Sequence, residues 1–226
     1  MIPRAWRANT VGEFFGKAGL LGIFGAFAAL KAMAIKNLLG SWEQIPDTKN
    51  YLDLAAHLAA FAFVILVLGT TLLRFRPTQT AEGWEPKFSA LIGTFLSLSL
   101  VALPPADLGS VWRVISVLLV LGGWVSSIYV LAWLGRSFSI VPQARRLITS
   151  GPYSVVRHPL YVSEEIAVIG IALMSISPIV ALIVVVQWMF QLRRMSNEER
   201  VLRSSFAEYA AYADRTPKVI PRLFRR

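Results

Sequence analysis

Long apolar runs separated by short polar segments dominate the chain. Four runs are predicted to be transmembrane helices, because a helix needs about 20 apolar residues to cross the hydrocarbon core. The third is short and ends at Pro104-Pro105, which cannot continue a helix. A fifth region, 160–192, is too long for one crossing and is broken by Ser177-Pro178, which predicts a tight helical hairpin in the membrane. The four predicted crossings are 14–36, 53–73, 88–104 and 111–134.

Composition agrees with an integral membrane protein. Of the 226 residues, 55% are hydrophobic and only 16% are charged, whereas soluble domains carry about a quarter charged residues. The first apolar run follows Arg4 and Arg7, as in a signal peptide, but it exceeds the roughly 7–15 apolar residues of such peptides. Its "AMA" stretch is a poor cleavage site because Lys31 and Lys36 flank it. We therefore expect a retained first transmembrane helix.

The net charge of +10 gathers beside the predicted helices. Basic residues fill the N-terminus, the 74–87 and 135–158 segments and the tail after Gln191, whereas the intervening 37–52 and 105–110 loops are neutral or acidic. This alternation follows the positive-inside rule and predicts that both termini are cytoplasmic, in a bacterial inner membrane or the endoplasmic reticulum. It favours contact with the lipid bilayer over nucleic-acid binding. The absence of cysteine excludes disulfides and thiolate chemistry.

The tail is amphipathic rather than apolar. Ser196 or Asn197 is a suitable helix N-cap, with the following glutamates in the favourable first turn. Apolar and aromatic side chains then recur at helical spacing: Val201, Leu202, Phe206, Tyr209 and Tyr212. The predicted fold class is therefore all-α: a polytopic membrane protein with about four transmembrane helices, a C-terminal helical hairpin and a cytoplasmic amphipathic tail helix.

Polar groups gather at the mouth of the hairpin in "GPYSVVRHPLYVSEE", residues 151–165. A helix can start directly after His158, because proline suits the first helical turn. His158, Tyr161 and Glu165 are then spaced to share a helix face, with Glu164 adjacent. An interfacial belt would explain Arg157 and Tyr161. It does not explain two consecutive glutamates entering a membrane segment, where carboxylates are costly and usually functional.

A second charged cluster follows the hairpin. Arg194 and Glu198 are four residues apart and can meet on one helical face. Taken alone, the pair is best interpreted as a surface ion pair, which contributes little energy. The hairpin, however, brings 157–165 and 193–199 to the same membrane surface. The two clusters together predict a pocket of imidazole, guanidinium, phenol and carboxylate groups above an apolar groove, suited to a charged cofactor and a lipid-borne substrate.

Several common sites are not indicated. The only histidines are His57 and His158, and no H-E-x-x-H motif occurs, so we predict no metal site. No G-x-G-x-x-G motif or phosphate-binding loop is present, which argues against a conventional soluble nucleotide fold.

Two motifs carry a resemblance to a known family. "LGRSFSIVPQARRLITSGPYSVVRHPLYVSE", 134–164, resembles the core motif of integral-membrane methyltransferases of the isoprenylcysteine carboxyl methyltransferase type. "RMSNEERVLRSSFAEYAAYADRTPKVIP", 194–221, resembles their second motif. The superfamily also includes phospholipid N-methyltransferases and, more distantly, membrane sterol reductases. Because the sequence shows no internal repeat and no low-complexity tract, we predict one domain over 1–226. The resemblance covers 134–221 and implies that 134–226 is the cofactor-binding and catalytic region, while 1–133 supplies N-terminal transmembrane helices.

The resemblance also implies S-adenosylmethionine as cofactor. By position in the motifs, the residues expected to bind it are Gln143, Arg146, Leu147, Ile148, Tyr153, His158, Pro159, Leu160, Tyr161 and Glu198. The same carry-over implies Arg194 and Glu198 as catalytic residues. Arg194 would face the acceptor group, and Glu164 is the other expected substrate contact.

The expected activity is methylation of the carboxylate of a prenylcysteine-like or other hydrophobic substrate that enters from the membrane. A carboxylate needs a cation such as Arg194 to orient it and no general base. An amine acceptor would have to lose a proton, so a phospholipid N-methyltransferase would depend on Glu164, Glu198 or Glu199. A reductase that binds NADPH at Arg145-Arg146 is a weaker alternative. A non-enzymatic scaffold or transporter would have no cofactor affinity.

Overall fold

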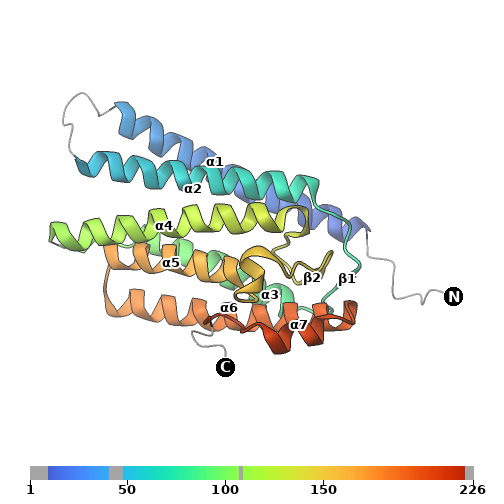
Figure 1. The fold of residues 1–226 in the computed structure, drawn as a ribbon. Coiled ribbons are helices and arrows are strands. Elements are labelled where there is room, and N and C mark those ends of the chain that lie inside the picture. The colour runs from blue at the N-terminus through green and yellow to red at the C-terminus, as the bar shows by residue number, and fades with distance from the viewer. Residues whose placement is uncertain (1–9, 41–47, 107–108, 222–226) are drawn as a thin grey trace.

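The computed structural model describes residues 10–40, 48–106 and 109–221, and in it nearly parallel and antiparallel helices form a bundle (Figure 1). Predicted features that involve Arg4, Arg7, Glu43, Asp47 or Asp107 lie outside the described residues. The predicted all-α fold is confirmed: the only β structure within the described ranges is a two-residue pairing. Four described helices are long and apolar enough to cross a membrane, so the chain is an integral membrane protein.

Three of the predicted crossings form long helices. These are α1 (Thr10–Gly40), α2 (Thr48–Leu73) and α4 (Ser110–Leu134). α1 packs on α2, and α2 packs on α4. Their shared core contains Phe24, Phe63 and Leu131, and continues into Phe138 and Ile140 beyond the end of α4.

The predicted third crossing, 88–104, is not one regular helix. It consists of α3 (Glu85–Phe95) followed by the 3₁₀ helix η2 (Leu96–Ala102). The hydroxyls of Thr94 and Ser99 donate hydrogen bonds to backbone carbonyls of the preceding turn. This pattern often bends helices. α3 and η2 together extend about 30 Å at the usual rise per residue.

The predicted hairpin is present, but its second arm is longer than expected. α5 (Pro159–Met174) and α6 (Pro178–Ser205) are joined at Ser177, whose hydroxyl accepts a hydrogen bond from the Val180 amide at 3.4 Å. At about 1.5 Å per residue, α6 extends about 42 Å, enough to cross a bilayer. The prediction that both arms are short is therefore wrong for α6.

The predicted N-cap at Ser196 or Asn197 is also wrong, because α6 continues through both residues. The Ser196 hydroxyl donates to the Leu192 carbonyl one turn earlier, and the Asn197 amide donates to Glu85 on α3. The local bond of Ser196 and the tertiary contact of Asn197 are both compatible with a continuous helix through this polar stretch. The separate tail helix is shorter than predicted and is α7 (Tyr209–Arg215).

Close helix packing positions the hairpin. α5 packs mainly on α4, and α6 mainly on α3. A Cβ atom at Gly123 of α4 would lie 2.5 Å from the Ala167 backbone nitrogen of α5, whereas one at Gly122 would meet nothing within 4 Å. The Ser116 hydroxyl donates to the Gly170 carbonyl across the same interface at 2.6 Å. The α4–α5 contact therefore depends on a glycine at position 123.

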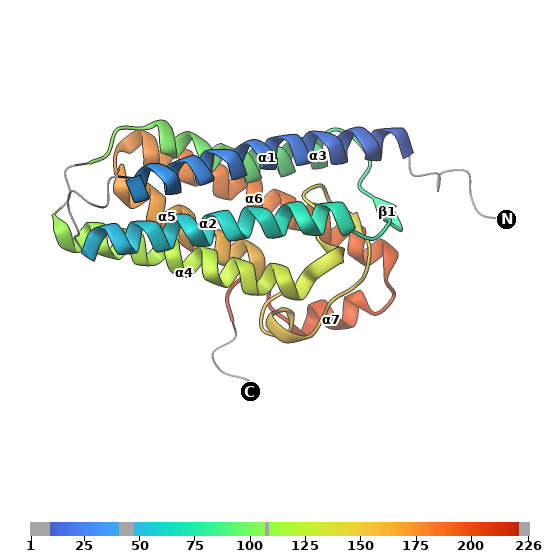
Figure 2. The same cartoon turned by 90° about the horizontal axis from the view of Figure 1, so that it is seen from above.

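The start of α1, the end of α4, the start of α5 and the whole of α7 lie at one end of the bundle, which we call the site end (Figure 2). Here β1 (Gln79–Thr80) pairs antiparallel with β2 (Gln143–Ala144). The 3₁₀ turns η3 (Gly135–Ser137) and η4 (Gly151–Ser154) lie between α4 and α5. Gly151 has a φ of +60°, and a Cβ atom there would lie 2.3 Å from the Trp133 ring.

Candidate active site

A cavity at the site end is enclosed by the 135–158 connection, the start of α5, the end of α6, and α7. It contains about 790 Å³ of empty space, including its open mouth. We call it the polar cavity. The predicted cofactor residues that line it are Gln143, Arg146, Leu147, Ile148, Tyr153, His158, Leu160, Tyr161 and Glu198. Residues that the sequence did not indicate as site residues also line it, among them Phe138, Arg157, Leu202, Tyr209 and Tyr212.

Pro159 is the one predicted cofactor residue outside the lining of the polar cavity. It is the first residue of α5 and is buried. His158 precedes it with φ −126° and ψ 57°, a non-helical conformation typical of a residue before proline. Pro159 therefore fixes where α5 starts and so how His158 and Tyr161 are presented.

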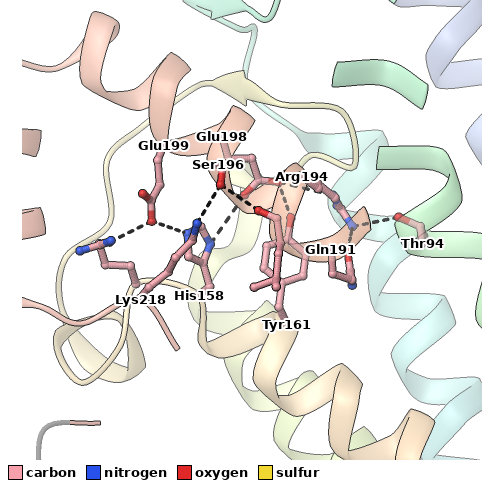
Figure 3. A network of polar contacts seen from close by, with 11 residues as sticks. Thr94, His158, Tyr161, Gln191, Arg194, Ser196, Glu198, Glu199 and Lys218 are labelled. Atoms are coloured by element: carbon pink, nitrogen blue, oxygen red, sulfur yellow. Dashed lines mark hydrogen bonds and ion pairs between the residues drawn. The ribbon is translucent and has the colours of Figure 1, made fainter. Parts of the chain in front are cut away.

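The hairpin brings Tyr161 and Glu198 into contact, as the sequence predicts (Figure 3). The Tyr161 hydroxyl donates to Glu198 Oε1, and the Arg194 Nε lies 3.5 Å from the same oxygen. The Arg194 guanidinium carbon lies 4.7 Å from the centroid of the Tyr161 ring. The Arg194–Glu198 pair is not the surface ion pair of the simpler interpretation, because Arg194 is only 3% exposed.

Glu199, which follows Glu198 on α6, forms a second set of contacts (Figure 3). Glu199 Oε1 lies 2.9 Å from His158 Nε2 and 3.0 Å from Arg157 Nε. The other ring nitrogen of His158, Nδ1, lies 4.0 Å from Glu198 Oε2. Glu198 and Glu199, consecutive on α6, thus bind Tyr161 and His158 of the 151–165 motif.

Arg157 joins the C-terminal segment to this network. Its Nη1 donates to the backbone carbonyls of Ala213 and Thr216, each at 2.7 Å. The backbone amides of Arg157 and His158 donate to the Pro217 and Lys218 carbonyls. The belt interpretation of Arg157 as a contact for lipid phosphates is therefore wrong, since its guanidinium binds the protein itself.

Three tyrosines form an aromatic side of the polar cavity. Tyr209 and Tyr212 of α7 have ring centroids 5.8 Å apart, and the Tyr212 hydroxyl donates to the Tyr153 carbonyl at 2.6 Å. Burial raises the pKa of Tyr212 to about 12 and, with the nearby Glu198 charge, that of Tyr153 further. These phenols are therefore neutral hydrogen-bond donors at physiological pH.

A second cavity, largely apolar, is bordered by Arg194. It contains about 990 Å³ of empty space and is lined by α1, α2, α3, η2, α4, α5 and α6. We call it the apolar cavity. Its polar lining includes Arg194 and Glu164, the two predicted substrate contacts, together with Thr94, Gln187 and Gln191. The Arg194 Nη1 donates to the Thr94 hydroxyl at 2.8 Å and to Gln191 at 3.5 Å.

The two cavities meet at a thin wall. Phe138 lines both, while Tyr161 and Glu198 line the polar cavity and Arg194 the apolar one. Arg194 contacts both Tyr161 and Glu198 directly. The contacts of Arg194 with Tyr161 and Glu198 therefore separate the two cavities.

The adjacent glutamates Glu164 and Glu165 are not equivalent. Glu164 lines the apolar cavity, whereas Glu165 is absent from the lining of both cavities. The predicted helix face shared by His158, Tyr161 and Glu165 therefore contributes only its first two members to the polar cavity. Among the described residues, no group of three or more histidine, aspartate or glutamate side chains is arranged to hold a metal ion.

The fold and the site define an integral membrane protein in which a helical hairpin brings a polar cavity next to an apolar one. The family model for phospholipid methyltransferases matches residues 111–209, which include α4, the polar-cavity segments and the hairpin. The region 111–209 therefore belongs to the membrane methyltransferases related to phospholipid and isoprenylcysteine methyltransferases.

Three curated proteins are similar to part of the chain. The protein-S-isoprenylcysteine O-methyltransferase B of Arabidopsis thaliana is 37% identical over 94 residues, 38% of this chain and 48% of the relative. The cobalt-zinc-cadmium resistance protein CzcN of Cupriavidus metallidurans is 36% identical over 118 residues, 45% of this chain and 53% of the relative. The nickel-cobalt-cadmium resistance protein NccN of Alcaligenes xylosoxydans xylosoxydans is 35% identical over 82 residues, 36% of this chain and 38% of the relative. The matches span about half of each relative or less.

Proposed function

We propose that this membrane methyltransferase uses S-adenosylmethionine to methylate the carboxylate of a prenylcysteine-like or other hydrophobic molecule. The contact of the polar and apolar cavities at Arg194 carries this proposal. It agrees with the name of the Arabidopsis relative, a protein-S-isoprenylcysteine O-methyltransferase. The active site would lie on the cytoplasmic side of the bacterial inner membrane or endoplasmic reticulum, with both termini cytoplasmic, because the site-end segments carry the basic residues.

The polar cavity has groups that suit this cofactor. Glu198 presents a carboxylate that would complement the positive charge of the cofactor, and Tyr153, Tyr209 and Tyr212 offer aromatic faces and hydroxyls. The Tyr209 hydroxyl is buried and has no hydrogen-bond partner among the described residues, an unsatisfied donor that a ligand could occupy. The proposed cofactor contacts are those of the polar-cavity lining, with His158 and Tyr161 held by Glu199 and Glu198.

When bound, S-adenosylmethionine supplies a methyl carbon whose bond to sulfur breaks, with the electron pair left on sulfur, as a bond to the acceptor oxygen forms. The protein contributes mainly position and desolvation. Arg194 can orient an acceptor carboxylate because its buried guanidinium lines the apolar cavity. Tyr161 and Glu198 fix the guanidinium from the other side.

Phospholipid amine N-methylation is the second candidate, favoured by the family model and by Glu164. A half-buried carboxylate in the apolar cavity could accept the proton that an ammonium acceptor must lose. The two candidates thus assign different roles to two residues of one cavity: Arg194 orients a carboxylate, or Glu164 deprotonates an amine.

The test is cofactor binding followed by methyl transfer in purified protein. We expect calorimetric binding of S-adenosylmethionine or its demethylated product, with His158→Ala and Glu198→Gln each weakening it at least tenfold. Arg194→Met should keep cofactor affinity and reduce turnover on prenylcysteine acids at least a hundredfold. Arg193→Met is the matched control, since Arg193 is an exposed neighbour paired with Glu85.

Absence of cofactor binding would refute the methyltransferase proposal. Radiolabelled transfer into phosphatidylethanolamine, lost in Glu164→Gln and kept in Arg194→Met, would instead establish the second candidate.

A further inference from the structure

A third cavity continues the apolar cavity toward the end of the bundle opposite the site. It contains about 1060 Å³ of empty space, again counting its opening. Residues that line both cavities show that they adjoin: Lys31, Ala60, Val101, Trp124 and Ile171. From Glu164, near the proposed acceptor group, to Ile171, where the cavities join, α5 rises about 10 Å.

Lys31 is the unusual residue at this junction. It lies within the α1 span, is partly buried, and forms no hydrogen bond or ion pair with a described residue. His57 and Asp53 line the third cavity with it, but the Asp53 carboxylate is paired with Arg113 at 3.3 Å. A cation at membrane depth without a partner is costly, and such residues usually serve a function.

Snorkelling does not explain Lys31 well. Nine residues, about 13 Å of helix, separate it from the end of α1 at Gly40, more than an extended lysine side chain reaches. Its lining of both apolar spaces shows that the side chain borders the interior of the bundle. The apolar cavity therefore presents cations at two places, Arg194 beside the polar cavity and Lys31 at the junction.

We propose that Lys31 binds an acidic group of the methyl acceptor, so that the acceptor is an amphiphile with two polar ends. One end, at Arg194, is methylated. The other, a carboxylate or phosphate at the far end of an apolar chain, pairs with Lys31. This proposal rests on the proposed function for the identity of the ligand, but the binding of an acidic chain at Lys31 is measurable without methyl transfer.

Long-chain dicarboxylic acids are suitable probes, compared with monocarboxylic acids of equal length. For the purified full chain in neutral detergent, calorimetry should give at least tenfold tighter binding of dodecanedioate than of dodecanoate. Within a series from octanedioate to hexadecanedioate, the preference should peak at intermediate length. Lys31→Met should abolish the preference, Lys31→Arg should retain it, and Lys36→Met, which removes an exposed lysine from the same helix, should leave it unchanged.

Equal binding of the two acids by the wild-type protein would overturn the proposal, and this comparison needs no variant to fold. A preference that survives in Lys31→Met would also overturn it. If phosphatidylglycerol rather than dicarboxylate binding depends on Lys31, the site holds a separate lipid and the two-ended acceptor is wrong. Failure of the proposed function would appear separately, as absent cofactor binding with the dicarboxylate preference intact.

Discussion

Replacing Arg157 should open the polar cavity without touching the residues proposed to contact acceptor. Arg157 Nε binds Glu199 at 3.0 Å, and its Nη1 binds the carbonyls of Ala213 and Thr216 at 2.7 Å each. Its side chain is 15% exposed. In Arg157→Met these acceptors lose their donor, and loss of one partner of a largely buried charged pair costs about 3 kcal/mol.

That cost should be local to the C-terminal segment, because Arg157 ties it to the body of the protein. At tenfold per about 1.4 kcal/mol, hydrogen exchange at the amides of α7 should accelerate about a hundredfold, while amides in α4 and α5 stay protected. Cofactor affinity should fall about tenfold or more, because Tyr209 and Tyr212 line the polar cavity from α7.

Arg200→Met is the matched control: it removes an exposed arginine on α6, one residue beyond Glu199. Its α7 exchange should match the wild type. Unchanged α7 protection in Arg157→Met would show that the guanidinium does not hold this segment, and the reasoning from its three bonds would fail.

Two further predictions concern glycines. Gly123→Ala should lower the melting temperature in detergent by several degrees, because its Cβ would overlap the α5 backbone. Gly122→Ala should be neutral or slightly stabilising. Equal melting temperatures of the two variants would contradict the packing of α4 on α5. Gly151→Ala combines a positive φ with overlap of the Trp133 ring and should cost about 2 kcal/mol or more of stability; an unfolding midpoint like that of the wild type would show that this turn is adaptable.

The fold was predictable where polar breaks interrupt the apolar pattern. Pro104-Pro105, Ser177-Pro178 and His158-Pro159 each fall at or beside a helix boundary, because proline limits helices by steric exclusion and a missing N–H. The continuation of α6 through Ser196 was not predictable, since Glu85, which binds the following Asn197, is 112 residues away in sequence. The tertiary contact with Glu85 outweighed the preference of Ser196 and Asn197 for a helix N-cap.

The polar half of the site was more predictable than its apolar half, for a physical reason. Spacing along one helix brings Arg194 and Glu198 together, and the hairpin adds His158 and Tyr161, so few alternatives remain once the hairpin is assumed. The apolar cavity instead depends on how nearly uniformly apolar helices are rotated about their axes. A stripe reveals the buried face of a helix only when the other face is polar, and in a membrane both faces can be apolar. Within α1, therefore, only a misfit such as Lys31 could mark the side that lines a cavity. From the sequence alone, Lys31 was interpreted as a charge that flanks the "AMA" stretch within the first span.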